Sequence, residues 1–175
     1  MPSPEKTSRA DIVAAGRALL ESEGPDGLTM QKVASRVGVR APSLYKHVAN
    51  RAALLDAVAE ATVEDLADRI ARTDGTLSAI ARCYRAFSTA HPEGFRLVMH
   101  SVHAPRSALA RAAQPLIDAT SDLVGEDESL EAARFVTAWL TGFIGMELSG
   151  SFRLGGDVDR AFTYGLDAMR RGLAG

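Results

Sequence analysis

The sequence has few of the features that mark secreted, disulfide-bonded or membrane proteins. Its 175 residues include one cysteine, Cys83, so no disulfide can form within the chain, which suits a reducing compartment. The longest uncharged apolar stretch, residues 135–146, is twelve residues long, whereas a membrane-spanning helix needs about 20. The first eleven residues, MPSPEKTSRAD, have no apolar segment of the kind found in signal peptides. We therefore expect a cytoplasmic protein.

Motifs for catalysis and metal binding are also missing. The sequence has no glycine-rich phosphate loop, no His-Glu-x-x-His and no Gly-x-Ser-x-Gly. Cys83 lies in an apolar helical pattern, which favours a buried thiol over a nucleophile. His100 and His103 are three residues apart, but no cysteine or carboxylate stands at a matching spacing to complete a zinc site. We predict that the protein is not an enzyme and has no metal site and no cofactor.

Charge is distributed unevenly along the chain. Residues 1–55 carry eight Lys or Arg and five Asp or Glu, a balance of +3, whereas residues 56–175 carry twelve basic and seventeen acidic residues, a balance of −5. Residues 27–51 hold five basic side chains and no acidic one. Such a patch on an otherwise acidic protein is typical of a phosphate-binding surface, although an ordinary solvated surface has the same signature.

Helical periodicity dominates, and no convincing alternating strand pattern is present, so the predicted fold is all-α with about nine helices. Each predicted break contains the Gly or Pro that favours a helix end, and Thr29 and Asn50 are candidate N-caps. The expected helices cover residues 7–23, 28–37, 40 or 41 to about 47, 51–72, 76–90, 93–103, 105–124, 128–150 and 157–173.

The segment 28–48, LTMQKVASRVGVRAPSLYKHV, has the pattern of a helix-turn-helix. Two short helices are joined at Gly38, a small residue, Ala34, stands where the helices cross, and Pro42 lies in the first turn of the second helix. Apolar residues are available behind both helices, namely Val33, Val37, Val39, Leu44 and Val48. The second helix is then free to present its polar side to the major groove of DNA.

The polar residues of this segment divide by their chemistry. Arg and Lys can donate to guanine, and Ser and Gln can read donor or acceptor edges, so base reading is assigned as a hypothesis to Gln31, Arg40, Ser43 and Lys46. Residue types that commonly hold phosphates suggest a second set of contacts, Thr29, Tyr45, His47 and Arg51. For Tyr45 and His47 the alternatives are, respectively, a half-buried packing residue and a surface residue without a contact.

With these residues in place, the sequence resembles the TetR family of bacterial repressors. The resemblance covers about residues 8–58 and is carried by LTMQKVASRVGV and APSLYKHVANRAALLDAV, in which Arg51 replaces the commoner lysine. The segment 91–97 and the segment 139–150 resemble one subgroup of the family, although Thr141 stands where that subgroup usually has histidine.

The resemblance implies a DNA-binding domain over residues 1–50 and a ligand-binding and dimerisation domain over residues 51–175. It implies a homodimer on a palindromic operator, with the last two helices of each subunit forming a four-helix bundle through Gly142, Gly145, Ser149 and Gly150 and apolar neighbours. A small-molecule effector would release the repressor from DNA. Candidate effector contacts are Phe87, Phe95, Met99, His103, Phe135, Trp139 and Phe143, each of which also suits an ordinary core position.

Two other classes of protein fit the sequence. One is a helical DNA-binding protein without an effector, acting as an architectural or constitutive factor. The other is a helical interaction module whose basic patch meets an acidic protein. Substitutions in the recognition helix separate the second class from the DNA-binding ones, and a ligand screen separates the first from an effector-controlled regulator.

Overall fold

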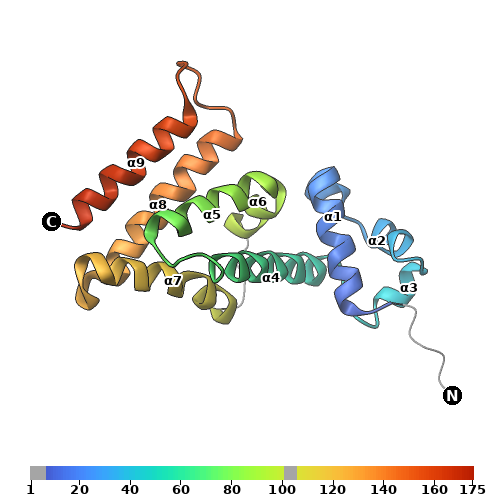
Figure 1. Cartoon of the computed structure of the whole chain (residues 1–175). Helices are drawn as coiled ribbons and strands as arrows, with labels where there is room; N and C mark the ends of the chain where they lie inside the picture. Colours follow the sequence, from blue (N-terminus) through green and yellow to red (C-terminus); the bar gives the residue numbers. More distant parts are fainter. Residues whose placement is uncertain (1–6, 101–105) are drawn as a thin grey trace. The chain divides into compact units, whose positions relative to one another are not determined.

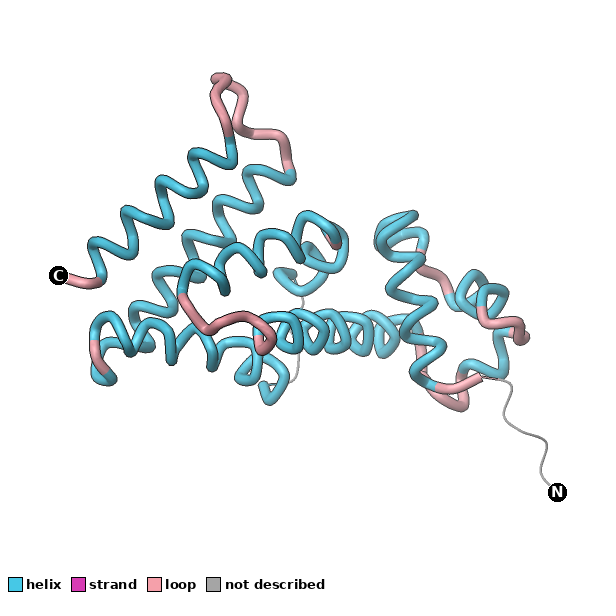
Figure 2. The backbone as a smooth tube through the Cα atoms, in the orientation of Figure 1, coloured by secondary structure: helices cyan, strands magenta, loops and turns pink. Residues whose placement is uncertain are grey.

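The computed structural model describes residues 7–100 and 106–175, and every regular element within these ranges is a helix, as Figures 1 and 2 show. The chain divides into two compact units, Met1–Glu64 with His91–Arg106, and Asp65–Ala90 with Ser107–Gly175. None of the described helices is both long enough and apolar enough to cross a membrane.

The first unit is built around the helix-turn-helix. It contains α1 (Arg9–Gly27), α2 (Met30–Arg36), α3 (Ala41–Leu44), the first part of α4 (Arg51–Ile70) and α6 (Pro92–His100). The apolar faces of α1 to α4 meet in one core, which holds Ile12, Ala15, Leu19, Leu20, Leu28, Val33, Ala34, Leu44, Val48, Leu54 and Val58. This core holds the two helices of the DNA-binding motif against α1 and α4.

Polar side chains fix the helix starts in this unit. Ser8 and Asp11 form a reciprocal capping box at α1, in which the Ser8 hydroxyl accepts from the Asp11 N–H and the Ser8 N–H donates to the Asp11 carboxylate. The predicted caps at Thr29 and Asn50 are confirmed, because their side chains accept from Lys32 N and Ala53 N at 3.3 and 2.9 Å. These caps set where α2 and α4 begin.

Two boundaries within the described residues differ from the sequence prediction by more than two residues. The third helix ends at Leu44, and a hydrogen-bonded turn then continues to Val48, where His47 N and Val48 N both donate to Leu44 O. The helix assignment of α1 continues to Gly27 across a kink, because Gly24 has φ 72° and the chain resumes a helical turn at Pro25. The predicted break at Gly24 is therefore present as a kink.

The second unit is a helical bundle. It contains the last part of α4, α5 (Leu77–Ala90), α7 (Arg106–Val124), the 3₁₀ turn Glu126–Glu128, α8 (Ser129–Leu148) and α9 (Val158–Leu173). The helices α8 and α9 lie side by side, joined by the loop 149–157 (Figure 1). Apolar residues of α5, α8 and α9 are buried between the helices, among them Ile80, Val136, Leu140, Ile144, Phe162 and Leu166.

Candidate DNA interface and effector region

The turn between α2 and α3 has the geometry that a helix-turn-helix requires. Gly38 has φ 73°, a backbone conformation that glycine adopts without strain, and Gly38 N and Val39 N donate to Ser35 O and Ala34 O. Ala34 is 2% exposed where the two helices cross, which leaves no room for a larger side chain. The turn thus fixes the angle at which α3 leaves the core.

The predicted base-reading residues lie on the outer side of this motif. Gln31, Arg40 and Lys46 are exposed, and Ser43 is half-buried. Three of the four line an open groove of about 550 Å³, namely Arg40, Ser43 and Lys46, and His47 and Thr7 line the same groove. The reading of bases by these side chains remains a prediction.

The predicted phosphate contacts have different surroundings. Tyr45 is 53% exposed, which leaves its ring and hydroxyl available to a ligand. Thr29 and His47 are half-buried, and the Thr29 hydroxyl already accepts the capping hydrogen bond at α2 while its own hydrogen stays available for donation. These three side chains suit contacts that set the register of the protein on DNA.

Arg51 takes part in the folded structure as well. Its Nε donates to Leu28 O at 2.8 Å and its Nη2 donates to Pro25 O, so the guanidinium ties the start of α4 to the end of α1. This contact could not be predicted from the sequence, because the partners of Arg51 are backbone carbonyls more than twenty residues away. The guanidinium has five N–H donors, and those not used here remain for the predicted phosphate contact.

One of the five basic side chains of residues 27–51 is paired with a carboxylate that lies outside those residues. Lys32 forms an ion pair with Glu23 on α1, and both side chains are partly exposed. The positive charge of the recognition face therefore comes chiefly from Arg36, Arg40 and Lys46, with Arg51 at its edge.

The predicted effector contacts fall in both units. Phe95 is buried and Met99 exposed in the first unit, whereas Phe87, Phe135, Trp139 and Phe143 belong to the second, and His103 lies outside the described residues. Phe87 is 3% exposed beneath the Arg69 guanidinium, 5.2 Å from its ring, while Phe135 is 55% exposed. Their role in ligand binding remains a prediction.

Trp139 and Phe143 belong to an aromatic cluster between α8 and α9. Their ring centroids are 5.4 Å apart, and each lies within 5.4 Å of Phe162 on α9. Gly165 makes this packing possible, because a Cβ there would lie 2.4 Å from Trp139 Cζ2. The cluster holds α8 and α9 together within the chain.

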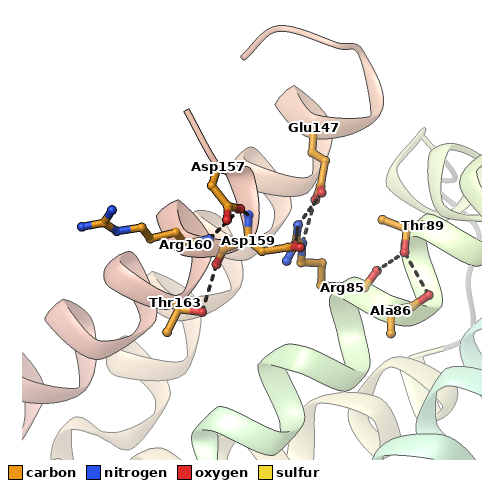
Figure 3. Close-up of polar contacts among 8 residues, drawn as sticks. All are labelled: Arg85, Ala86, Thr89, Glu147, Asp157, Asp159, Arg160 and Thr163. Atoms are coloured by element: carbon orange, nitrogen blue, oxygen red, sulfur yellow. Dashed lines mark hydrogen bonds and ion pairs between the residues drawn. The ribbon is translucent and has the colours of Figure 1, made fainter. Parts of the chain in front are cut away.

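An ionic cluster that the sequence reasoning missed joins three helices of the second unit. Arg85 on α5 donates to both carboxylate oxygens of Glu147 on α8 and lies 2.7 Å from Asp159 on α9 (Figure 3). The same guanidinium lies 4.7 Å from the Phe162 ring centroid. These contacts raise the pKa of Arg85, chiefly through the hydrogen bonds to Glu147, so the charge is permanent. Arg85 stands four residues after Ala81 and three before Ser88, so helical spacing places it on the same face of α5 as these two buried residues. This spacing was the available signal that Arg85 lies near the core.

Part of the α8 and α9 surface is apolar and is not covered by any other part of the chain that the structure describes. Phe135 and Met146 on α8 and Tyr164 on α9 are 55%, 47% and 72% exposed. Between the two α8 residues, Gly142 and Gly145 have no atom within 4 Å of the position that a Cβ would occupy. This surface is open to a further helix.

Comparison with known proteins gives two matches to family models. Residues 12–58 match the model for bacterial regulatory proteins of the tetR family, and residues 77–169 match the tetracyclin repressor-like C-terminal domain. Among curated proteins, an uncharacterized HTH-type transcriptional regulator of Mycobacterium tuberculosis is 31% identical over 173 residues, which cover 91% of this chain and 78% of that protein. The class A tetracycline repressor of Escherichia coli is 40% identical over 91 residues, 42% of its own length.

Solved structures agree over nearly the whole chain. A protein of unknown function from Rhodococcus matches with a TM-score of 0.77 and 26% identity, covering 99% of this chain and 100% of that one. A variant of TetR from Acinetobacter baumannii in complex with minocycline matches with a TM-score of 0.72 and 26% identity, covering 95% of this chain and 96% of that one. Both the fold and the order of its parts are thus shared.

Proposed function

The chain belongs to the TetR family of bacterial DNA-binding regulators, and we propose that it represses transcription from a palindromic operator until a small-molecule effector releases it. The observation that carries the proposal is the recognition face of α2 and α3, where Arg40, Tyr45 and Lys46 are exposed beside a stretch without a carboxylate. In this role the protein catalyses no chemical reaction and acts in the cytoplasm, where its operator DNA lies.

On DNA, Arg40, Ser43 and Lys46 enter the major groove and Gln31 reaches it from α2. Thr29, Tyr45 and His47 hold the phosphates on either side, and Arg51 adds a contact from the start of α4. Each phosphate contact adds about −0.9 to the slope of log affinity against log salt, so operator binding is steeply salt-dependent.

The repressor acts as a homodimer, because a palindromic site needs two recognition helices about 34 Å apart, one turn of B-DNA. The uncovered surface of α8 and α9 supports this assembly, since Gly142 and Gly145 admit a closely packed helix between Phe135 and Met146. Two copies related by a two-fold axis place α8 and α9 of each in a four-helix bundle.

The effector acts by binding better to a conformation that fits the operator poorly. The helix α4 takes part in both units, so a shift of α4 would change the separation of the two recognition helices. By linkage, the operator then weakens effector binding by the same factor. The minocycline complex of the Acinetobacter TetR supports an effector for this chain without fixing its chemistry.

Selection of genomic fragments on the purified protein, followed by sequencing, tests DNA binding. We expect enrichment of a two-fold-symmetric site that is lost with Tyr45→Ala and retained with Arg72→Ala, a truncation to alanine of an exposed residue of the second unit. Fragments enriched without symmetry contradict the palindromic operator, and no enrichment at low salt contradicts the proposal. Small molecules that raise the melting temperature are then assayed for release of the selected fragment.

Sedimentation tests the dimer through Gly142→Leu. Among the described residues a Cβ at Gly142 has no neighbour within 4 Å, so we expect the protomer to fold as the wild type does, whereas a partner helix packed against Gly142 would be displaced. We expect a dimeric wild type and a variant that dissociates at micromolar concentration. A monomeric wild type, or a variant that dimerises unchanged, would contradict this interface.

A further inference from the structure

The open groove beside the recognition helix brings together two distant parts of the chain. Its lining comes from the α2–α3 turn, from α3 and from the turn after α3, namely Gly38, Val39, Arg40, Ser43, Lys46 and His47, and from Thr7, just before α1 begins. The N-terminal edge of α1 therefore forms one wall of a groove whose other wall is the DNA-reading surface.

Thr7 differs from the other buried hydroxyl residues of the described chain. The residue is 7% exposed, and its buried side-chain oxygen has no hydrogen-bond partner. By contrast, a backbone carbonyl accepts a hydrogen bond from each of the other buried hydroxyls, which belong to Thr62, Ser88, Thr120 and Ser129. Because buried polar groups are nearly always paired, a lone one at the wall of a groove points to a ligand that completes it.

Helix capping does not explain Thr7. The N-cap of α1 is Ser8, whose hydroxyl accepts from Asp11 N at 3.1 Å and donates to the Asp11 carboxylate at 2.7 Å. The capping box is complete without the preceding hydroxyl. The Thr7 hydroxyl therefore takes no part in capping α1.

The charges around the groove identify the ligand as an anion. Arg40 and Lys46 are exposed and line the groove, and none of its described lining residues carries a carboxylate. Arg40 and Lys46, which flank α3, face the operator in the proposed complex. The anion that the groove would meet there is a phosphodiester of the DNA backbone.

We infer that this groove holds one operator phosphate and that the Thr7 hydroxyl donates to it, while Arg40 and Lys46, whose ends reach the bases in the proposed complex, supply positive charge nearby. A small rotation of the Thr7 side chain on binding turns the covered hydroxyl toward the groove. Thr7 is then a positioning residue that ties the start of α1 to DNA and reads no base. This inference rests on the operator binding proposed above.

The test is Thr7→Val, which keeps the shape of the side chain and removes only the hydroxyl, with Thr7→Ser as the matched variant that keeps it. Because the hydroxyl has no internal partner, the valine variant should melt at or above the wild-type temperature. Its affinity for the selected operator, measured by fluorescence anisotropy, should fall by about tenfold or more, as for a lost hydrogen bond to a charged group. Thr7→Ser should bind within about threefold of the wild type.

Two further readouts separate a phosphate contact from other causes. Loss of a neutral donor should weaken operator and unrelated duplex alike and leave the salt slope unchanged, whereas Lys46→Ala should lower that slope by about 1. Thr7→Val binding as tightly as the wild type would overturn the inference while the wild type still binds its operator. Failure of the wild type to bind any duplex would instead overturn the proposed function.

If Thr7→Val does not fold, the wild type and Thr7→Ser are tested on operators with single methylphosphonate substitutions. One substituted position should weaken both proteins, and its effect should shrink in Thr7→Ala. Equal effects in all three proteins at every position would overturn the contact.

Discussion

Replacing Gly165 by alanine should destabilise the second unit, although alanine is the better helix former. The new Cβ would lie 2.4 Å from Trp139 Cζ2 and 3.1 and 3.2 Å from Cε2 and Cη2. Carbon atoms pack at about 3.5–4.0 Å, so the indole or the helix must move by about 1 Å. The ring has little freedom to do so, because Phe143 and Phe162 each lie 5.4 Å from it. Overpacking of this kind costs about 1–3 kcal/mol.

Gly172→Ala is the matched control on the same helix. A Cβ at Gly172 has no neighbour within 4 Å, so that variant should gain up to about 1 kcal/mol from helix propensity alone. The propensity gain is common to both variants, so their difference isolates the clash at about 1–3 kcal/mol. For a chain of this length each 1 kcal/mol moves the melting temperature by about 2–4 °C.

Urea denaturation at one fixed protein concentration measures both variants, followed by circular dichroism and by fluorescence of Trp139, which is the sole tryptophan. Trp139→Leu combined with Gly165→Ala should abolish the extra cost, because the clashing ring is gone. The reasoning is refuted if Gly165→Ala is as stable as Gly172→Ala, or if its cost persists in the Trp139→Leu background.

Three further outcomes are expected. Arg85→Met should lower the free energy of unfolding by about 2 kcal/mol by leaving Glu147 unpaired and half-buried, and Asp159→Asn by less than about 1 kcal/mol because Asp159 is largely exposed; equal urea midpoints would contradict this. Hydrogen bonds from Ser8 lower the pKa of Asp11, so the stability that the Asp11 carboxylate adds at neutral pH should disappear as the pH falls through this lowered pKa. A difference in unfolding free energy between the wild type and Asp11→Asn that is the same at all pH values would refute it. Burial raises the pKa of Cys83, so its alkylation at pH 8 should be slower in the folded than in the urea-unfolded chain, and equal rates would argue against burial.

The sequence predicted the parts of the fold that local chemistry determines. Thr29 and Asn50 cap their helices as expected, and Gly38 takes the positive φ that its place in the turn requires. The end of α3 was missed, because the residues after Leu44 form a turn whose N–H groups share the Leu44 carbonyl, a choice that propensity does not reveal. The break expected at residues 23–27 is a kink at Gly24, and the helical turn after it was not predicted.

Contacts between distant residues were beyond sequence reasoning. Arg51 looked like a phosphate ligand from its charge, yet part of its guanidinium binds the Pro25 and Leu28 carbonyls. No prediction was made for Arg85, whose partners Glu147 and Asp159 are brought to it by α8 and α9. In both cases the partner depends on tertiary packing, which no local pattern encodes.

The glycines of α8 and α9 show how the packing inside one chain differs from the packing we propose between two. Gly165 is filled by the Trp139 ring, so its lack of a side chain is explained within the protomer. Gly142 and Gly145 are interior to α8, where each costs about 1 kcal/mol relative to alanine, and no described side chain comes within 4 Å of the position that a Cβ would take at either one. A helix from a second subunit would recover that cost by packing closely against α8. Alanine at these two positions should therefore stabilise an isolated protomer but weaken the dimer. A rise in both stability and dimer affinity, measured by urea denaturation and sedimentation, would show that α8 makes no close contact with a partner.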